Sequence, residues 1–237
     1  MFNITTRKMK DLVLFGLVLV ILGGCATAKV DKTKKTTGPL PRPDMVIVND
    51  FAVTSADVKL DKGVVAKAMR DSDSRSISEE EDKVGRMVAS KLSEFLVEEL
   101  REVGIEATRA SSQVMPSSTT LMLSGQFITI DEGNQTKRVW VGFGLGRTDL
   151  RTRIQAIQGG QLIAEAETKA RSGLKPGMLT SLSIGAAAAT VVPIVVGTVI
   201  TGVSEAFLAI VEKDAKRTAK EVAKKVEKAY QDRGWLP

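Results

Sequence analysis

The spacing of apolar positions along the chain predicts two long helices. Between Glu79 and Val103, apolar residues recur every three or four positions. This spacing is typical of a helix with one buried face, with Ser78 as the expected N-cap and Gly104 as the expected stop. A second helix is predicted from Glu205 onwards. Its apolar stripe contains Ala215, Ala219, Val222, Val226 and Tyr230.

Shorter apolar runs predict strands, each bounded by turn residues. A first strand covers Met45 to Val48, and the chain after the central helix carries several more. The later strand candidates are Ile105–Arg109, Thr119–Ile130, Val139–Val141, Leu150–Gln158 and Leu162–Ala170, with turns at Asp131–Asn134 and Gly159–Gly160. We therefore predict an α/β (α+β) domain over residues 44–175, completed by a C-terminal helix within 205–237. Its antiparallel sheet has about five strands, with the central and C-terminal helices packed on it.

Residues 176–204 form a Gly/Ala-rich segment without a single charged side chain. We predict that it is helical and inserted between the strands and the last helix. Small residues recur at every fourth position, and such a stripe lets helix backbones approach closely in membranes. The candidate contact residues for a membrane or an oligomer are Gly185, Ala189, Pro193 and Gly197. Pro193 breaks a single span near its middle, so a soluble hairpin that covers the domain's own core remains an alternative.

The N-terminus has the three zones of an export signal. Basic residues come first, an apolar run from Leu12 to Leu22 follows, and small residues lead to Cys25, the only cysteine. The apolar run is shorter than the roughly 20 residues of a transmembrane helix. Leu22-Gly23-Gly24-Cys25 resembles the lipobox of bacterial lipoproteins. This resemblance implies that residues 1–24 are a signal peptide and that Cys25 becomes acylated, with membrane lipid as its partner.

Residues 25–43 are rich in Lys, Thr and Pro and lack apolar periodicity, so we expect a lipidated N-terminus and flexible tether. The tether would reach about 60 Å when fully extended. Ala26 follows the cysteine, and by resemblance to Gram-negative lipoproteins a residue other than Asp implies sorting to the outer membrane. The expected location is the cell envelope, with the domain facing the periplasm.

Composition narrows the range of functions. The precursor of 237 residues has a formal charge of +6, but aromatic residues make up only 4%, and no nucleic-acid-binding motif is present. The chain has no histidine, which excludes Ser-His-Asp and Cys-His catalysis and His-based zinc sites. We expect no metal and no cofactor. Carboxylates remain the only candidates for acid–base chemistry.

Three motifs have a plain structural interpretation beside a functional one. Gly142 to Gly146 could cradle a phosphate, but strand-like residues on both sides favour a hairpin turn. The basic residues of the C-terminal helix are interleaved with acids, which favours a solvated face over a membrane-binding stripe. Asp131 and Glu132 are adjacent in a turn, which favours solvated turn residues over a catalytic pair.

Several motifs together resemble the DUF4410 bacterial lipoproteins. They are Asn49-Asp50-Phe51, Gly125-Gln126-Phe127 with Asp131-Glu132-Gly133-Asn134, Val141-Gly142-Phe143-Gly144, and Arg217-Thr218-Ala219-Lys220 with Gly234-Trp235. The resemblance covers most of residues 44–237. The family's function is unknown, so it implies no catalytic residues. The order of elements is also similar to that of the small α/β domain in curli-secretion lipoproteins, a likeness of fold that does not assign function.

Three functional hypotheses follow. The first is a non-catalytic envelope lipoprotein that binds or assembles with envelope proteins or with its own copies, without nucleic acid. The second is a membrane-inserting oligomer built through residues 176–204. The third is an envelope enzyme that uses carboxylates alone. Its candidate residues are Asp50, Asp57, Asp131 and Glu132.

Overall fold

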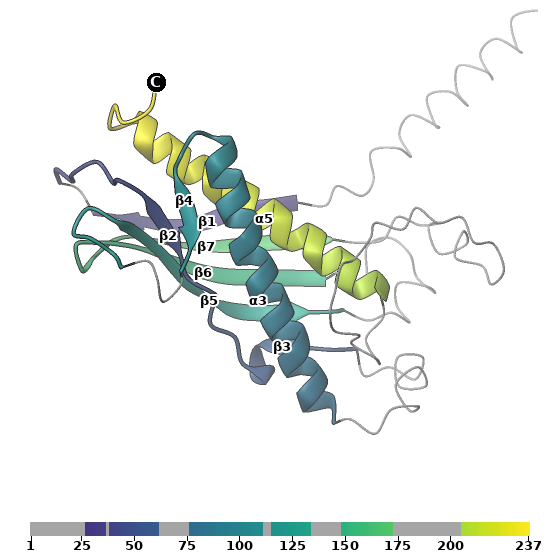
Figure 1. Cartoon of the computed structure of the whole chain (residues 1–237). Coiled ribbons are helices and arrows are strands. Elements are labelled where there is room, and N and C mark those ends of the chain that lie inside the picture. The colour runs from purple at the N-terminus through teal and green to yellow at the C-terminus, as the bar shows by residue number, and fades with distance from the viewer. Residues whose placement is uncertain (1–26, 37, 62–75, 111–114, 134–147, 173–204) are drawn as a thin grey trace, which may run out of the picture.

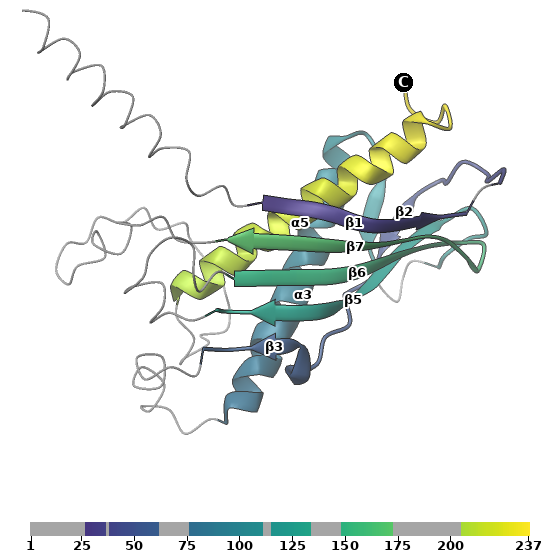
Figure 2. The ribbon, with the colours of Figure 1, turned by 180° about the vertical axis from the view of Figure 1, so that it is seen from behind.

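The computed structural model describes residues 27–36, 38–61, 76–110, 115–133, 148–172 and 205–237. In this part of the chain seven strands form one sheet, and two helices cover one of its faces (Figure 1, Figure 2). The helices are α3 (Ile77–Glu102) and α5 (Glu205–Gln231). The strands are β1 (Thr27–Lys35), β2 (Val46–Val48), β3 (Val58–Lys59), β4 (Ala107–Arg109), β5 (Leu121–Asp131), β6 (Thr148–Gln158) and β7 (Gln161–Ser172), and the 3-10 turn η1 (Ser55–Asp57) precedes β3.

The sheet is mixed, so the prediction of a purely antiparallel sheet is wrong, although about five strands was close. The order is β1-β7-β6-β5-β2-β4, with β3 beside β5. β1, β7, β6 and β5 are antiparallel neighbours, whereas β2 runs parallel to both β4 and β5, and β3 runs parallel to β5. The β2–β4 pair is parallel because α3 carries the chain back between them, and such a crossover joins strands of the same direction.

The central helix forms as predicted, but it begins earlier. Ser76, rather than Ser78, is the N-cap. Its hydroxyl accepts the N–H of Glu79 at 3.3 Å, and the Glu79 carboxylate accepts the N–H of Ser76 at 3.1 Å. This reciprocal pairing satisfies two amides that the first turn leaves free. The helix stops where predicted, since Gly104 has a φ of 79°.

Residues 27–35 correct the prediction of a flexible tether, because they form the edge strand β1. Thr27 lies opposite Arg171 and Lys35 lies opposite Ala164 of β7. The strand was missed because its side chains are mostly lysine and threonine. Lysine is common on edge strands, where its charge prevents pairing with another chain, so the composition resembles that of a linker.

The core lies between the helices and the inner face of the sheet. Leu92 of α3, Leu123 of β5 and Leu150 of β6 are almost completely buried there. On α5, the predicted apolar stripe is confirmed, since Ala215, Ala219, Val222 and Tyr230 are buried and Val226 is packed against them. The outer face of the sheet carries the polar side chains of the same strands, as expected when one face is solvated.

Two motifs of the family resemblance meet in this core. The Phe51 and Phe127 ring centroids lie 6.0 Å apart. Gly125 lies beneath Phe51, and a Cβ at this position would lie 2.3 Å from the Arg153 carbonyl oxygen and 2.7 Å from Phe51 Cε1. The glycine is therefore required by packing, because β6 and the Phe51 ring occupy the space of a side chain.

Substitution Gly125→Ala is expected to lower the free energy of unfolding by about 2–3 kcal/mol, because the backbone of β6 must move to admit a methyl group. Urea denaturation measures the loss. Gly38→Ala is the matched control, since a Cβ there meets nothing within 4 Å. Equal stability of the two variants would contradict the close approach at Gly125.

Candidate functional site

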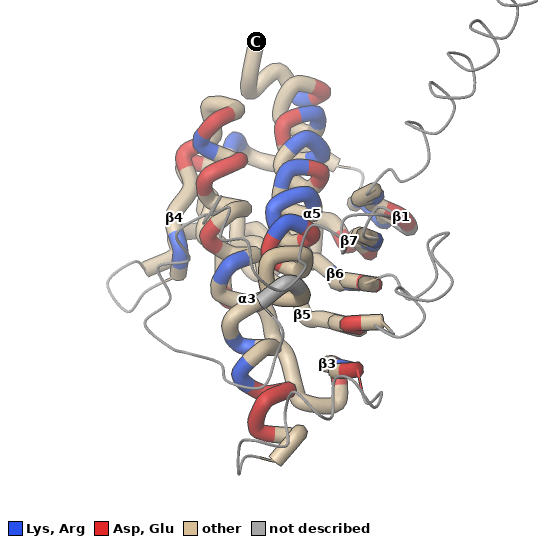
Figure 3. Tube along the Cα trace, turned by 90° about the vertical axis from the view of Figure 1, so that its right-hand side faces the viewer, with Lys and Arg blue, Asp and Glu red and all other residues tan. Residues whose placement is uncertain are grey.

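Strand ends meet in one row at one end of the sheet, which we call the Thr27 end. β1 begins there with Thr27 opposite Arg171, close to the end of β7. Ser172, the last residue of β7, lies opposite Thr148, the first residue of β6. β5 ends in the neighbouring position at Asp131. Figure 3 is turned toward this end and shows β1, β7, β6, β5 and β3 on one side of the two helices.

Two segments predicted to contact the membrane are joined in sequence to strands at the Thr27 end, although both lie outside the described residues. Cys25 precedes Thr27 by two positions, and residues 176–204 belong to the connection between Ser172 and Glu205. The predicted contact residues of that segment, also outside the described part, are Gly185, Ala189, Pro193 and Gly197. The fold therefore connects the lipidation candidate and the uncharged segment to the same end of the sheet.

A buried carboxylate fastens α5 to this end. Asp214 is fully buried and accepts hydrogen bonds from Thr148 Oγ1 and Ser172 Oγ, each at 2.9 Å. Arg217, one helical turn further on, donates to both Asp214 and Ser172. Thr218 Oγ1 donates to the Asp214 carbonyl at 2.8 Å. The network satisfies the buried hydroxyls, which would otherwise lower stability.

The prediction that the acids of the C-terminal helix lie on a solvated face is wrong for Asp214, although a signal for its burial was present. Asp214 follows Val211 by three positions and precedes Thr218 by four, so all three lie on the buried stripe of the helix. An acid within an apolar stripe indicates a buried partner, because an unpaired buried charge costs several kcal/mol.

The outer face near the Thr27 end carries paired charges. Asp149 accepts from Arg151 at 2.9 Å and from Arg171 at 3.0 Å. Partial burial raises the pKa of Asp149, but the hydrogen bonds and charges of the two guanidinium groups outweigh burial and hold the pKa below its ordinary value. The same contact raises the pKa of Arg151.

Three basic residues stand side by side across this face. Arg151 lies opposite Lys169, and Lys169 lies opposite Lys29. In the described residues, neither lysine has an ion-pair partner. Like charges directly opposite each other destabilise a sheet, and an anionic surface would relieve that repulsion.

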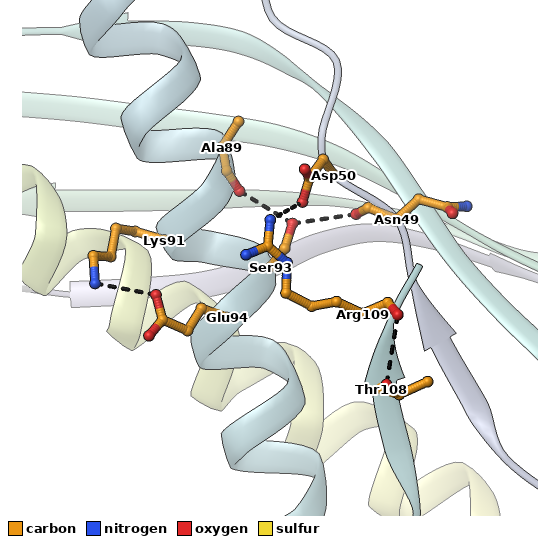
Figure 4. A network of polar contacts seen from close by, with 8 residues as sticks. All are labelled: Asn49, Asp50, Ala89, Lys91, Ser93, Glu94, Thr108 and Arg109. Atoms are coloured by element: carbon orange, nitrogen blue, oxygen red, sulfur yellow. Dashed lines mark hydrogen bonds and ion pairs between the residues drawn. The ribbon is translucent and has the colours of Figure 1, made fainter. Parts of the chain in front are cut away.

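The carboxylates proposed for an enzyme have structural partners. Asp50 forms an ion pair with Arg109 of β4, next to Ser93 Oγ, which donates to the Asn49 carbonyl at 3.2 Å (Figure 4). These contacts connect the loop after β2 with β4 and α3. Asp57 accepts the Thr54 N–H and hydroxyl, each at 2.9 Å.

The two adjacent acids at the end of β5 also accept hydrogen bonds from backbone amides. Asp131 accepts the Gly133 N–H at 2.7 Å, and Glu132, which is fully buried, accepts the Asp61 N–H at 2.7 Å. The prediction that Glu132 is a solvated turn residue is therefore wrong. A mutational scan for chemistry at these positions must separate loss of folding from loss of activity.

In the described parts of the chain, no helix is both long enough and apolar enough to cross a membrane. The same residues contain no group of three or more acids, histidines or cysteines arranged to hold a metal ion. The predicted Gly142 to Gly146 turn lies outside them.

Comparison with known proteins identifies a family. The family model of DUF4410, a domain of unknown function, matches residues 46–189, which confirms the family. That these proteins are lipoproteins stays a prediction for this chain. A comparison with curated proteins finds no match.

Solved structures give only distant likenesses. The PelC dodecamer from Paraburkholderia phytofirmans aligns at 10% identity and a TM-score of 0.39, covering 83% of this chain and 98% of that one. An uncharacterized protein aligns at 12% identity and a TM-score of 0.33, with 79% and 95% covered. These likenesses are too weak to carry a function from one protein to another.

Substitution Asp214→Ala is expected to lower the free energy of unfolding by about 3 kcal/mol, because it removes the buried carboxylate that accepts from Thr148 and Ser172 and pairs with Arg217. Chemical denaturation checks the value. Asp232→Ala is the control, since its carboxylate pairs with Lys228 at the surface and should contribute less than about 1 kcal/mol. Similar losses in both variants would show that the Asp214 network does not fasten α5.

Proposed function

Since this chain belongs to the DUF4410 family, whose function is unknown, we propose that it is a lipid-anchored envelope protein with a non-catalytic binding or assembly role. Its mature form would begin at acylated Cys25, and its domain would face the periplasm at the outer membrane. The motifs Leu22-Gly23-Gly24-Cys25 and Ala26 support the anchor and its sorting by resemblance to bacterial lipoproteins.

One observation carries this proposal: the strand β1 begins only two residues after Cys25. Two extended residues span about 7 Å, whereas the tether expected from sequence would have reached about 60 Å. A lipid on Cys25 would therefore hold the Thr27 end of the sheet against the bilayer. The protein would work at the membrane surface and not at a distance from it.

The charges near the Thr27 end support this orientation. Lys29 and Lys169 stand opposite each other on the outer face, and Arg151 and Arg171 in the same region share one carboxylate, Asp149. Each basic residue close to an anionic membrane contributes about 1 kcal/mol of attraction. The outer face at this end would thus favour anionic headgroups.

The uncharged segment 176–204 gives this proposal a second membrane contact. The nearest described residues on its two sides are Ser172 and Glu205, and Ser172 lies at the Thr27 end. Because the acylated cysteine would lie at that end too, the segment would meet the bilayer without a long connection. Gly185, Ala189, Pro193 and Gly197 would form the close contact, with lipid or with a second copy. Pro193 favours partial insertion over a single span.

The anchor is tested by Cys25→Ser, which removes the thiol that accepts the lipid. Labelling of cells with a fatty acid should then give no labelled protein, and the uncleaved precursor should accumulate. Cys25 is the only cysteine, so any remaining label would come from another residue and would contradict the lipoprotein assignment.

The membrane-facing end is tested with a full chain exported by a non-lipid signal, so that acyl chains cannot contribute. We expect this protein to float with vesicles that contain anionic lipid. The double variant Lys29→Gln and Lys169→Gln should bind about thirtyfold more weakly, because two attractive charges of about 1 kcal/mol each are lost. The control is Lys224→Gln with Lys228→Gln, which removes the same charge from α5.

Deletion of residues 178–204 should weaken vesicle binding further, and light scattering would report whether it also turns an oligomer into a monomer. Equal binding by the lysine variant and its control would rule out the proposed orientation. If the non-acylated chain with residues 176–204 intact is monomeric and does not bind vesicles, the second membrane contact is ruled out.

A further inference from the structure

A cavity of about 120 Å³ lies between the C-terminal half of α5 and the inner face of the sheet. It is at the opposite end from Thr27, beside the end of β6 and the start of β7. Figure 1 shows the C-terminal end of α5 on this side of the molecule. The apolar lining includes Leu40, Leu123, Ile154, Ile163, Val226 and Trp235.

Two buried polar atoms on the cavity wall have no hydrogen-bond partner in the described chain: Tyr230 Oη and Gln158 Oε1. These side chains are 6% and 4% exposed. Gln158 Nε2 donates to the carbonyls of Pro41 at 3.0 Å and Thr119 at 3.2 Å, which fixes the amide so that its oxygen remains free. A buried polar group without a partner lowers stability, so two in one cavity indicate a bound group that supplies the partners.

The phenol of Tyr230 keeps its proton under ordinary conditions. Burial raises the pKa of Tyr230 to about 12, so the hydroxyl is a hydrogen-bond donor at neutral pH. Gln158 Oε1 can only accept. A ligand hydroxyl meets both requirements, because its oxygen accepts from the phenol and its hydrogen is donated to the amide oxygen.

The more exposed part of the cavity lining is basic. Lys35 and Lys225 are exposed, and Arg233 is half-buried over the Trp235 ring, with 5.4 Å between the guanidinium carbon and the ring centre. Within the described chain, none of these three cations forms an ion pair. Glu165 also lines the cavity, but it accepts a hydrogen bond from Gln155 at 3.1 Å. The exposed side of the cavity therefore favours an anionic group.

We infer that this cavity binds a small amphipathic carboxylate with a hydroxyl at the end opposite its charge. The carboxylate would lie at Lys35, Lys225 and Arg233, and the hydroxyl would reach Tyr230 and Gln158. The apolar body is limited to about one aromatic ring or a short alkyl chain, since a closed cavity of about 150 Å³ holds benzene and this slightly smaller one is open on its basic side. This inference stands apart from the membrane anchor, because the cavity lies at the other end of the sheet.

The test uses the full chain exported by a non-lipid signal, with calorimetry and NMR as the measurements. The probe is 4-hydroxyphenylacetate. Phenylacetate lacks the hydroxyl, 4-hydroxyphenylethanol lacks the charge, and 6-hydroxyhexanoate carries the same groups on an alkyl chain. We expect 4-hydroxyphenylacetate or 6-hydroxyhexanoate to bind about three- to tenfold more tightly than each incomplete compound, as expected for one hydrogen bond or one favourable charge.

Two variants locate the contacts. Tyr230→Phe should reduce binding of 4-hydroxyphenylacetate to the level of phenylacetate, with a melting temperature that is unchanged or higher because an unpaired hydroxyl is removed. Lys225→Gln should weaken both carboxylates alike. Lys224→Gln is its matched control, since Lys224 pairs with Glu221 and does not line the cavity.

The inference is overturned if none of the hydroxylated carboxylates binds at millimolar concentration, or if phenylacetate binds as tightly as its hydroxylated form. A marked fall in the melting temperature of Tyr230→Phe would also overturn it, because the hydroxyl would then have a structural partner. None of these outcomes depends on lipidation, so failure here is distinct from failure of the membrane proposal.

Discussion

Burial of one face of the sheet beneath α3 and α5 is the constraint that organises the molecule. The inner face carries apolar side chains such as Leu123 and Leu150, whereas the next residues along the same strands point outwards. Because strand side chains alternate, this single choice of face puts Asp149, Arg151 and Lys169 on the outer surface together. The basic region near the Thr27 end is thus a consequence of how the core is covered.

Because α5 covers this face of the sheet, polar groups buried beneath it need hydrogen-bond partners within the interface. Asp214, on the buried side of α5, accepts hydrogen bonds from Thr148, Ser172 and Arg217. Its role is therefore structural, because it holds α5 on the sheet. Tyr230 and Gln158, at the other end of the same interface, each leave one atom unpaired in the described chain. A carboxylate with its donors in place therefore marks a structural contact, whereas two unpaired atoms that line one cavity mark a candidate binding site.

Strand direction gives the two ends of the sheet different roles in the proposed function. β1 begins at the Thr27 end, and its antiparallel pairing with β7 places Ser172 there as well. A short connection from Cys25 would then hold this end at the membrane and leave the α5 C-terminus and its cavity on the far side. Such a chain would face lipid with one end and a small soluble molecule with the other.

The sequence alone determined those elements whose signals are local. The apolar period of α3, the apolar stripe of α5, the alternation in β6 and the turn at Gly159–Gly160 all lie within short windows, and the structure confirms them. The sequence also supplied the family, through short motifs such as Asn49-Asp50-Phe51. The acylation of Cys25 stays a prediction, because Cys25 lies outside the described residues.

Only the tertiary structure decided the features that join distant segments. β1 resembles a linker in composition, and its pairing with β7, more than a hundred residues away, makes it a strand. The parallel pairing of β2 with β4 follows from the path of α3 over the sheet. The spacing of apolar residues predicts the helix but not this path. Gln158 belongs to β6, whose sequence shows only an alternation of apolar and polar residues. Tyr230 belongs to α5, whose sequence shows only an apolar stripe. Their shared cavity exists because α5 lies across β6, a long-range contact that no local signal encodes.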